Sequence, residues 1–293
     1  MKQRLYRKRR SAFTLVEIMV AAAITIIMIG LVIQITSEVL KVWNRSVGKL
    51  SANAEARIAM ELLTNDLESI LLVNNGQQWL RVESEANVGN PIVGQTVGLK
   101  LFAPAMDRPK IDADGVPIPG NICGIAYRLA LAPAYGSNPA NNNFILYRSL
   151  LNSKDTFNDL MGPSQPNNPQ LELTENSNAF WSASQITEEN NYLAGNIVNF
   201  KIFIYGIDSS GDEVILNSED GVTIDDDYIY GGTDSNEEVP LYAEIFLTIV
   251  SDEGLDILIL PSLSGTGYSN VDDVVREHGE VFKRRVDFQA KPL

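Results

Sequence analysis

The chain has 293 residues, enough for one large or two small globular domains. Its 37 acidic residues outnumber its 23 basic ones, and the resulting formal charge of −14 argues against a nucleic-acid-binding protein with a broad basic face. Cys123 is the only cysteine, so no intrachain disulfide can form and the fold must rest on an apolar core.

A basic N-terminal segment precedes a long apolar run. The run, residues 15–35, contains only Glu17 and Gln34 as strongly polar residues, and a helix of this length spans about 31 Å, the thickness of a bilayer core. The segment before it has no acidic residue and six basic ones, namely Lys2, Arg4, Arg7, Lys8, Arg9 and Arg10. This bias predicts a cytoplasmic N-terminus, with the residues after about 36 across the membrane.

Glu17 is the residue of this run that needs a partner, because an ionised side chain at membrane depth is costly unless an opposite charge pairs with it. Residues 11–17, SAFTLVE, resemble the cleavage site of type IV prepilins and type II secretion pseudopilins. The resemblance implies that a prepilin peptidase cuts between Ala12 and Phe13 and N-methylates Phe13. It also implies that Glu17 pairs with the Phe13 amine of a neighbouring subunit. Ala12 departs from the family, which usually has glycine there.

Two other interpretations of the N-terminus stay open. A conventional secretory signal would be cut at a small-residue site, for which Ala21-Ala22-Ala23 is the candidate, but this cut would leave an exposed apolar terminus. A plain signal anchor fits the hydropathy equally well and leaves Glu17 unexplained.

The next segment predicts an amphipathic helix. Apolar residues recur at intervals of three and four from residue 36 to about 73, and no proline occurs in residues 1–90. We therefore expect one rod of about 55–60 residues that ends near residues 74–76. The expected organisation is a leader at 1–12, a membrane and filament-core helix at 13–35, an amphipathic helix at 36–75 and a β-rich periplasmic head at 76–293.

Short alternating or β-branched runs follow residue 76. We predict strands at 79–82, 97–102, 122–131, 144–150, 197–205, 213–216, 241–250, 256–260 and 281–288. Val198, Phe200, Ile202 and Ile204 should share one face, and residues 208–211 should turn the chain into a hairpin. Two insertions, 103–121 and 152–184, are interpreted as binding loops or mobile segments. The fold class is α+β, with a long helix packed on an antiparallel sheet.

The sequence offers little for catalysis. His278 is the only histidine and sits in a charged stretch, interpreted as a solvated helix end or loop, and no Gly-x-Ser-x-Gly turn is present. Cys123 is interpreted as a small core residue. We predict no enzyme activity and no cofactor. Asp225, Asp226 and Asp227 are weak calcium candidates, with a solvated acidic turn as the favoured interpretation.

Later segments extend the resemblance. Residues 57–68, 126–129, 146–148, 195–200 and 239–245 resemble the helix and strands of J-type minor pseudopilins and PilW-like minor pilins. This implies a type IV pilin-like fold and a tip or initiator subunit of the periplasmic pseudopilus of a type II secretion system. Implied partners are the inner membrane, prepilin peptidase, an assembly platform, and minor and major pseudopilins. A minor pilin of a surface type IV pilus, for adhesion, motility or DNA uptake, and a membrane-tethered enzyme or binding domain remain as alternatives.

Overall fold

The computed structural model describes residues 14–73, 76–85, 93–105, 122–133, 142–161, 172–175, 178–208, 210–232, 236, 238–260 and 262–288. Its contacts divide the chain into two compact units, Met1–Val47 and Gly48–Leu293. We refer to the second unit as the head. One helix, α1, contributes to both units, and all strands belong to the head.

Helix α1 runs from Leu15 to Glu68, 54 residues without a proline. It ends earlier than the sequence predicts, and just past its end the Ser69 N–H still donates to the carbonyl oxygen of Asn65 at 3.1 Å. The following residues are extended, and the Leu71 N–H donates to the carbonyl oxygen of Phe102 at 3.1 Å.

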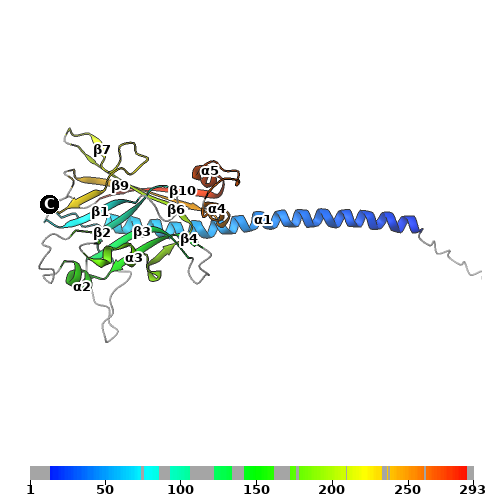
Figure 1. Ribbon diagram of the computed structural model, residues 1–293, viewed down its shortest axis with the longest axis horizontal. Coiled ribbons are helices and arrows are strands. Elements are labelled where there is room, and N and C mark those ends of the chain that lie inside the picture. The colour runs from blue at the N-terminus through cyan, green and yellow to red at the C-terminus, as the bar shows by residue number, and fades with distance from the viewer. Residues whose placement is uncertain are drawn as a thin grey trace, which may run out of the picture. The chain divides into compact units, whose positions relative to one another are not determined.

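Six antiparallel strands form the larger sheet of the head, in the order β5-β4-β3-β2-β1-β8. Figure 1 labels four of them, β1 to β4. Their bounds are β1 Gln78–Glu85, β2 Thr96–Ala103, β3 Cys123–Pro133, β4 Asn142–Leu151, β5 Tyr192–Ala194 and β8 Tyr228–Gly231. The sequence analysis missed the two short edge strands β5 and β8. Tyr127 of β3 lies opposite Arg148 of β4, so both side chains project from the same face.

A second antiparallel sheet has the order β10-β9-β6-β7. Its strands are β6 Ile197–Ile207, β7 Glu213–Ile215, β9 Pro240–Val250 and β10 Gly279–Asp287. The predicted hairpin is confirmed, because Ile207 of β6 pairs with Glu213 of β7. The predicted apolar face of β6 is confirmed as well, since its four members are fully buried.

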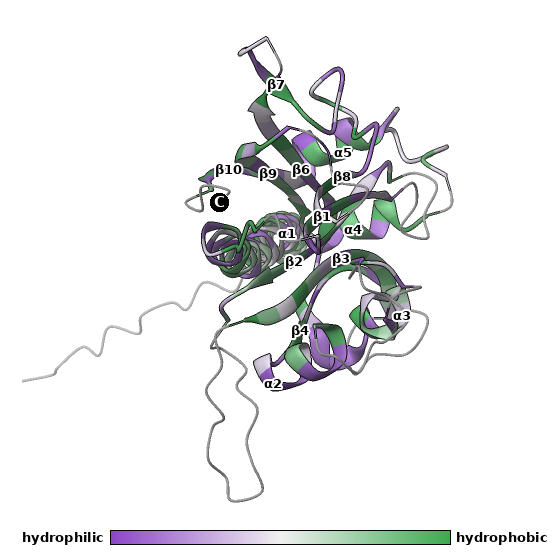
Figure 2. Ribbon diagram, turned by 90° about the vertical axis from the view of Figure 1, so that its left-hand side faces the viewer, coloured by the Kyte–Doolittle hydropathy of each residue, from purple (hydrophilic) through white to green (hydrophobic). Residues whose placement is uncertain are grey.

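The part of α1 inside the head packs against both sheets in one apolar core (Figure 2). The buried residues of this part are Ala52, Ala56, Ala59, Met60, Leu63 and Leu67. Small residues at three of these positions let the helix approach the strands closely. The predicted α+β class, a long helix with antiparallel sheets, is confirmed.

The prediction of a loop or mobile insertion at 152–184 is wrong for its described part. This part contains the short helices α2 Ser153–Asp155, η1 Thr156–Leu160, η2 Ala179–Trp181 and α3 Ala183–Ile186. Leu160, Leu173 and Trp181 are buried, and Trp181 packs edge-on against Phe102 of β2 at 5.7 Å. The segment is therefore a layer of the core. A further short helix, η3 Glu189–Asn191, leads into β5. Residues 106–121 of the other insertion lie outside the described residues.

The strand predicted at 256–260 is also wrong. Helix α4 spans Asp252–Leu258 and turns Leu255 and Leu258 into the core. Its start is capped by Ser251, whose side chain accepts from the Gly254 N–H at 3.4 Å. A second helix, α5 Val271–His278, contacts α4 and runs directly into β10.

Charged residues line the face of β1, β2 and β3 that is turned away from α1. Glu83 forms ion pairs with Arg81 and Lys100 at 2.7 Å, and Glu85 pairs through Oε1 with Arg128 at 2.7 Å. The other oxygen of Glu85, Oε2, is buried and has no hydrogen-bond partner in the described part of the chain. Burial raises the pKa of Glu85 to about 7, although Arg128 acts in the opposite direction.

This pKa predicts a pH dependence of stability. Between about pH 4.5 and 7 the folded head binds more protons at Glu85 than the unfolded chain does, so its free energy of unfolding should fall as pH rises, by up to about 3 kcal/mol. Glu85→Gln should remove this fall in the free energy of unfolding, because glutamine does not titrate. Urea unfolding at pH 5 and pH 8 checks it, with the exposed Glu61→Gln as control. An identical pH dependence in Glu85→Gln and the unchanged chain would contradict it.

Candidate functional site

The first turn of α1 holds the acidic residue that the sequence singles out. The Thr14 N–H and hydroxyl both donate to Glu17 Oε2, at 2.9 and 3.1 Å, and the Glu17 N–H is 3.3 Å from the Thr14 hydroxyl oxygen. Thr14 and Glu17 therefore form a reciprocal capping box, in which each side chain satisfies a backbone donor of the helix start. The Thr-x-x-Glu spacing is visible in the sequence, but the sequence analysis did not use it and so missed Thr14.

Only one oxygen of Glu17 is used by this cap. Glu17 Oε1 has no partner among the described residues and is free to accept from a donor outside the chain. Its neighbours are apolar, and Leu15, Val16, Ile18 and Met19 are all more than half exposed. A carboxylate in such surroundings is stable only with a cationic partner once water is removed. Ala12 and Phe13, the predicted cleavage site, lie outside the described residues.

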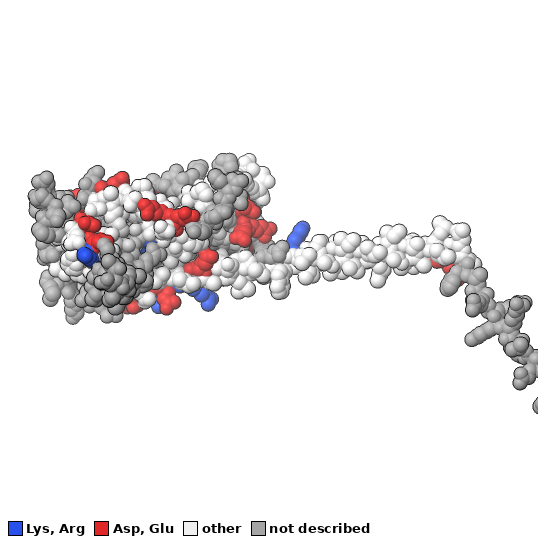
Figure 3. Space-filling view, turned by 90° about the horizontal axis from the view of Figure 1, so that it is seen from below, with Lys and Arg blue, Asp and Glu red and all other residues white. Residues whose placement is uncertain are grey.

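The helix around Glu17 has the properties of a membrane span. Among the described residues, α1 is the one helix long and apolar enough to cross a membrane, judged by length and composition. The side chains from Leu15 to Trp43 are exposed, and most of them are uncharged (Figure 3). Such a surface requires lipid or other apolar helices around it.

His278 lies elsewhere than the sequence predicts. It is only 3 % exposed, and its Nε2 is 2.8 Å from the Tyr268 hydroxyl, while its Nδ1 is 3.7 Å from Glu253 Oε2. The solvated position is wrong because α5 packs on α4 at Gly254. A Cβ at Gly254 would lie 2.7 Å from that of His278, so glycine permits the close contact.

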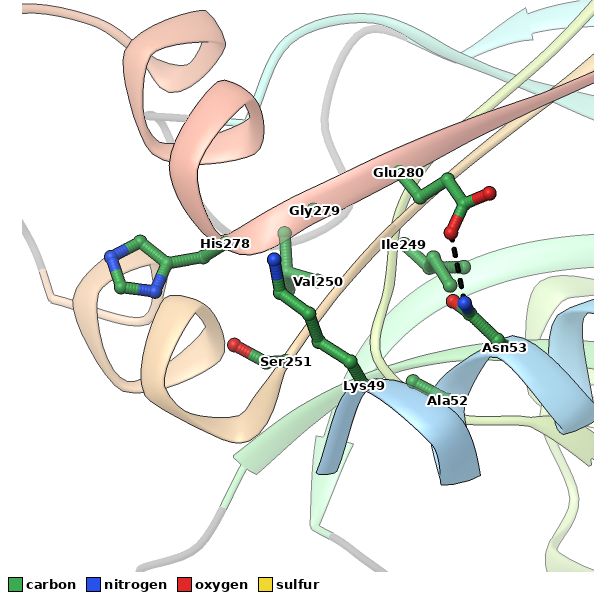
Figure 4. Close-up of a pocket in the computed structure, with 9 residues that line it drawn as sticks. All are labelled: Lys49, Ala52, Asn53, Ile249, Val250, Ser251, His278, Gly279 and Glu280. Atoms are coloured by element: carbon green, nitrogen blue, oxygen red, sulfur yellow. Dashed lines mark hydrogen bonds between the residues drawn. The ribbon is translucent and has the colours of Figure 1, made fainter. Parts of the chain in front are cut away.

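A cavity of about 50 Å³ lies beside this contact (Figure 4). Lys49 and Asn53 extend from α1 toward the junction of α5 and β10 (Figure 4). The Lys49 ammonium donates to the carbonyl oxygen of Glu277 at 3.1 Å, and the Asn53 amide donates to Glu280 Oε2 at 2.8 Å. These polar contacts fasten the head segment of α1 to α5 and β10.

The three calcium candidates are not gathered into one site. Asp225 accepts from the Glu219 N–H at 2.8 Å, whereas Asp227 accepts from the Ser84 N–H and from Arg81. In the part of the chain that the structure describes, no three His, Cys, Asp or Glu side chains are grouped to hold a metal ion. Cys123 is buried, as predicted for a core residue.

Comparison with known proteins bears on the N-terminus. Residues 7–33 match the family model of the prokaryotic N-terminal methylation motif, and this segment includes Ala12, Phe13 and Glu17. None of the curated proteins matches the chain. A type IV-like pilin from Thermus thermophilus is similar in structure, with a TM-score of 0.35 and 8 % identity over 80 % of this chain and 96 % of that one. A similarity this low carries no argument, so the α+β assignment rests on the strands and helices themselves.

Proposed function

We propose, from the N-terminal methylation motif at residues 7–33, that this chain is a prepilin-type subunit of a filament, and more specifically a minor pseudopilin of a type II secretion system. The observation that carries the proposal is Glu17, a carboxylate with a free oxygen, one turn into a membrane-length apolar helix. A structural subunit, without enzyme activity and without a cofactor, is the function that this arrangement supports best.

Processing is the first step of the proposed sequence of events. The chain enters the inner membrane with its N-terminus in the cytoplasm and its head in the periplasm. A prepilin peptidase cuts between Ala12 and Phe13 and the new Phe13 amine is methylated. Loss of residues 1–12 leaves 17 basic and 37 acidic residues, a formal charge of −20, which favours solubility of the head.

Assembly is the second step. The helix leaves the lipid and packs among the helices of other pseudopilins, where Glu17 Oε1 accepts from the Phe13 amine of a neighbour. Thr14 positions the carboxylate for this contact, because the capping box fixes its other oxygen. Pairing makes burial of both charges tolerable and aligns the subunits at one register. An assembly ATPase, together with a platform in the membrane, would supply the energy for extracting the helix from the lipid.

A second candidate function has the same architecture. As a minor pilin of a surface type IV pilus, the chain would serve adhesion, motility or DNA uptake. The resemblance of the head segments to J-type minor pseudopilins favours secretion and a position at the filament tip.

Deletion of the gene in its host separates these functions. We expect export of proteins across the outer membrane to stop while surface filaments persist, as measured by secreted-protein assays and electron microscopy of the same cells. Loss of surface filaments with normal export would assign the chain to a pilus. Retention of both would contradict a filament role and favour a membrane-tethered domain.

A further inference from the structure

Strand β10 is a long open edge of the head. A sheet edge presents unpaired N–H and C=O groups to other chains, and most proteins keep such edges short or covered. Of the four edges of the two described sheets, β5 and β7 are short, with three residues each. Asn236 covers β8, because it accepts from the Ile229 N–H and donates to the Ile229 carbonyl oxygen. Strand β10 differs from these three, since it has nine residues and ends its sheet next to β9 (Figure 2).

The register of β10 shows which of its backbone groups face the open edge. In an antiparallel pair, residues whose N–H and C=O groups face the partner alternate with residues whose groups face away. The His278 carbonyl oxygen accepts from the Ser251 N–H at 2.9 Å, and the Phe288 N–H donates to the Leu241 carbonyl oxygen at 3.0 Å. The register between these two contacts has no shift, so the even-numbered residues of β10 bond to β9. The odd-numbered residues that direct their backbone groups outward are Val281, Lys283, Arg285 and Asp287.

These outward groups are accessible. Within the described part of the chain, no hydrogen bond involves the N–H of Val281, Lys283 or Arg285. Val281 is 53 % exposed, and the side chains of Lys283 and Arg285 are 51 % and 55 % exposed. Val286, an even-numbered residue, is buried, so the odd-numbered side chains lie on the face of the sheet that is turned away from the core. The described elements therefore leave room for one more strand beside β10.

The side chains of this edge favour an acidic partner. Lys283, Arg284 and Arg285 are consecutive, in a chain with 37 acidic and 23 basic residues. Lys283 contacts Glu244 at 2.8 Å and Arg285 contacts Asp287 at 3.0 Å, but ion pairs at a protein surface contribute little and can exchange partners. Among the described residues, Arg284 has no carboxylate partner. A strand with acidic side chains would thus add attraction to the backbone pairing.

A second copy of β10 is a poor partner for this edge. An antiparallel pair of two β10 strands centred on Arg284 would place Lys283 of one copy opposite Arg285 of the other. Like charges directly opposite each other destabilise a strand pair. The basic residues therefore disfavour pairing between copies and leave the edge to a different polypeptide.

We propose that the edge of β10 binds an extended acidic segment of another polypeptide, which adds an antiparallel strand to the sheet. The backbone of the segment pairs with the outward N–H and C=O groups of the odd-numbered residues. Its acidic side chains lie on the outer face of the sheet, beside Lys283 and Arg285. This surface belongs to the head and does not depend on the N-terminal methylation motif.

The first test measures peptide binding to the purified full-length chain in detergent at pH 7.5, by fluorescence polarisation. The probe is a labelled peptide as long as β10, in which glutamate alternates with threonine. Glutamates on the outer face direct their own N–H groups to β10, so N-methylation of the glutamates should weaken binding about tenfold or more. N-methylation of the threonines changes only the far edge of the peptide and should leave the affinity unchanged. Lysine in place of glutamate should also weaken binding, by charge repulsion.

The second test changes the protein. Val281→Pro removes one outward N–H and no bond to β9, so it should weaken binding of the glutamate peptide about tenfold. Val281→Thr keeps the N–H and should bind like the unchanged chain. Arg284→Gln should weaken binding about threefold. Its control is Arg276→Gln in α5, a cation whose side chain is 78 % exposed and which should have no effect.

The melting temperature shows whether Val281→Pro is folded, and the peptide comparison uses the unchanged chain and so holds in either case. Equal affinity for the two N-methylated peptides, or no binding of the glutamate peptide at about 1 mM, would overturn the proposal. Unchanged affinity of a folded Val281→Pro variant would also overturn it. Light scattering that shows dimers of the unchanged chain, abolished by Val281→Pro, would instead assign the edge to a second copy.

Discussion

Replacing Asp66 with alanine is expected to lower the free energy of unfolding of the head by about 3–5 kcal/mol, because it leaves a buried guanidinium without its counter-charge. Arg148 holds Asp66 through two contacts, Nε to Oδ2 at 2.8 Å and Nη2 to Oδ1 at 3.1 Å. Tyr127 donates to the same Oδ2 at 2.5 Å. The side chains of Asp66 and Arg148 are 6 % and 2 % exposed, so water cannot replace the lost partner.

Urea unfolding of the full-length chain in detergent, followed by tryptophan fluorescence, measures this loss. Glu61→Ala, an exposed change on the same helix, is the control and should stay within about 0.5 kcal/mol of the unchanged chain. The pair of changes Asp66→Leu and Arg148→Met should cost less than Asp66→Ala, since it leaves no unpaired charge. A loss below 1 kcal/mol for Asp66→Ala would show that this network does not hold α1 on the sheet.

Replacing Glu17 with alanine is expected to lower the fraction of the chain found in assembled filaments about 100-fold. The change leaves the amine of a neighbouring subunit unpaired in an apolar environment, and removing one partner of a buried pair costs about 3–5 kcal/mol. Immunoblots of filament and membrane fractions from the host measure the ratio. The head should unfold as before, because Glu17 lies outside the unit Gly48–Leu293.

Two further variants distinguish the effect of the Glu17 charge from the effect of the capping box at the start of α1. Glu17→Gln can still accept from Thr14 but has no charge, so it should also fail to assemble. Thr14→Ser keeps the hydroxyl of the cap and should assemble normally. Normal assembly of both glutamate variants would contradict the role given to this carboxylate.

The sequence predicts a strand well where apolar residues recur at every second position over a long segment and lie in the core. Val198, Phe200, Ile202 and Ile204 recur at every second position, and all four are fully buried in β6. The same reasoning fails at 256–260, because residues 257–260 are a continuous apolar run that is too short to distinguish a strand from a helix. The better signal was Ser251 followed by two acidic residues, which is typical of a helix start. Trp181 and His278 are buried by tertiary packing, although the polar residues around them in the sequence had suggested loops.

Two polar clusters differ in how far the sequence can locate them. Glu17 and its cap lie within four consecutive residues, so their spacing alone identifies the N-terminal site. A second polar cluster joins Glu55, Asn143, Tyr192 and Asp252, which are brought together by α1, two strands and α4. No local pattern connects such distant positions, and only the packed head brings them together.

The most direct test of a prepilin-type subunit is the intact mass and N-terminal sequence of the protein recovered from membranes of its own host. We expect a chain that begins at N-methylated Phe13, with residues 1–12 removed. A chain that still begins at Met1 would contradict prepilin processing and would support a membrane-tethered domain instead.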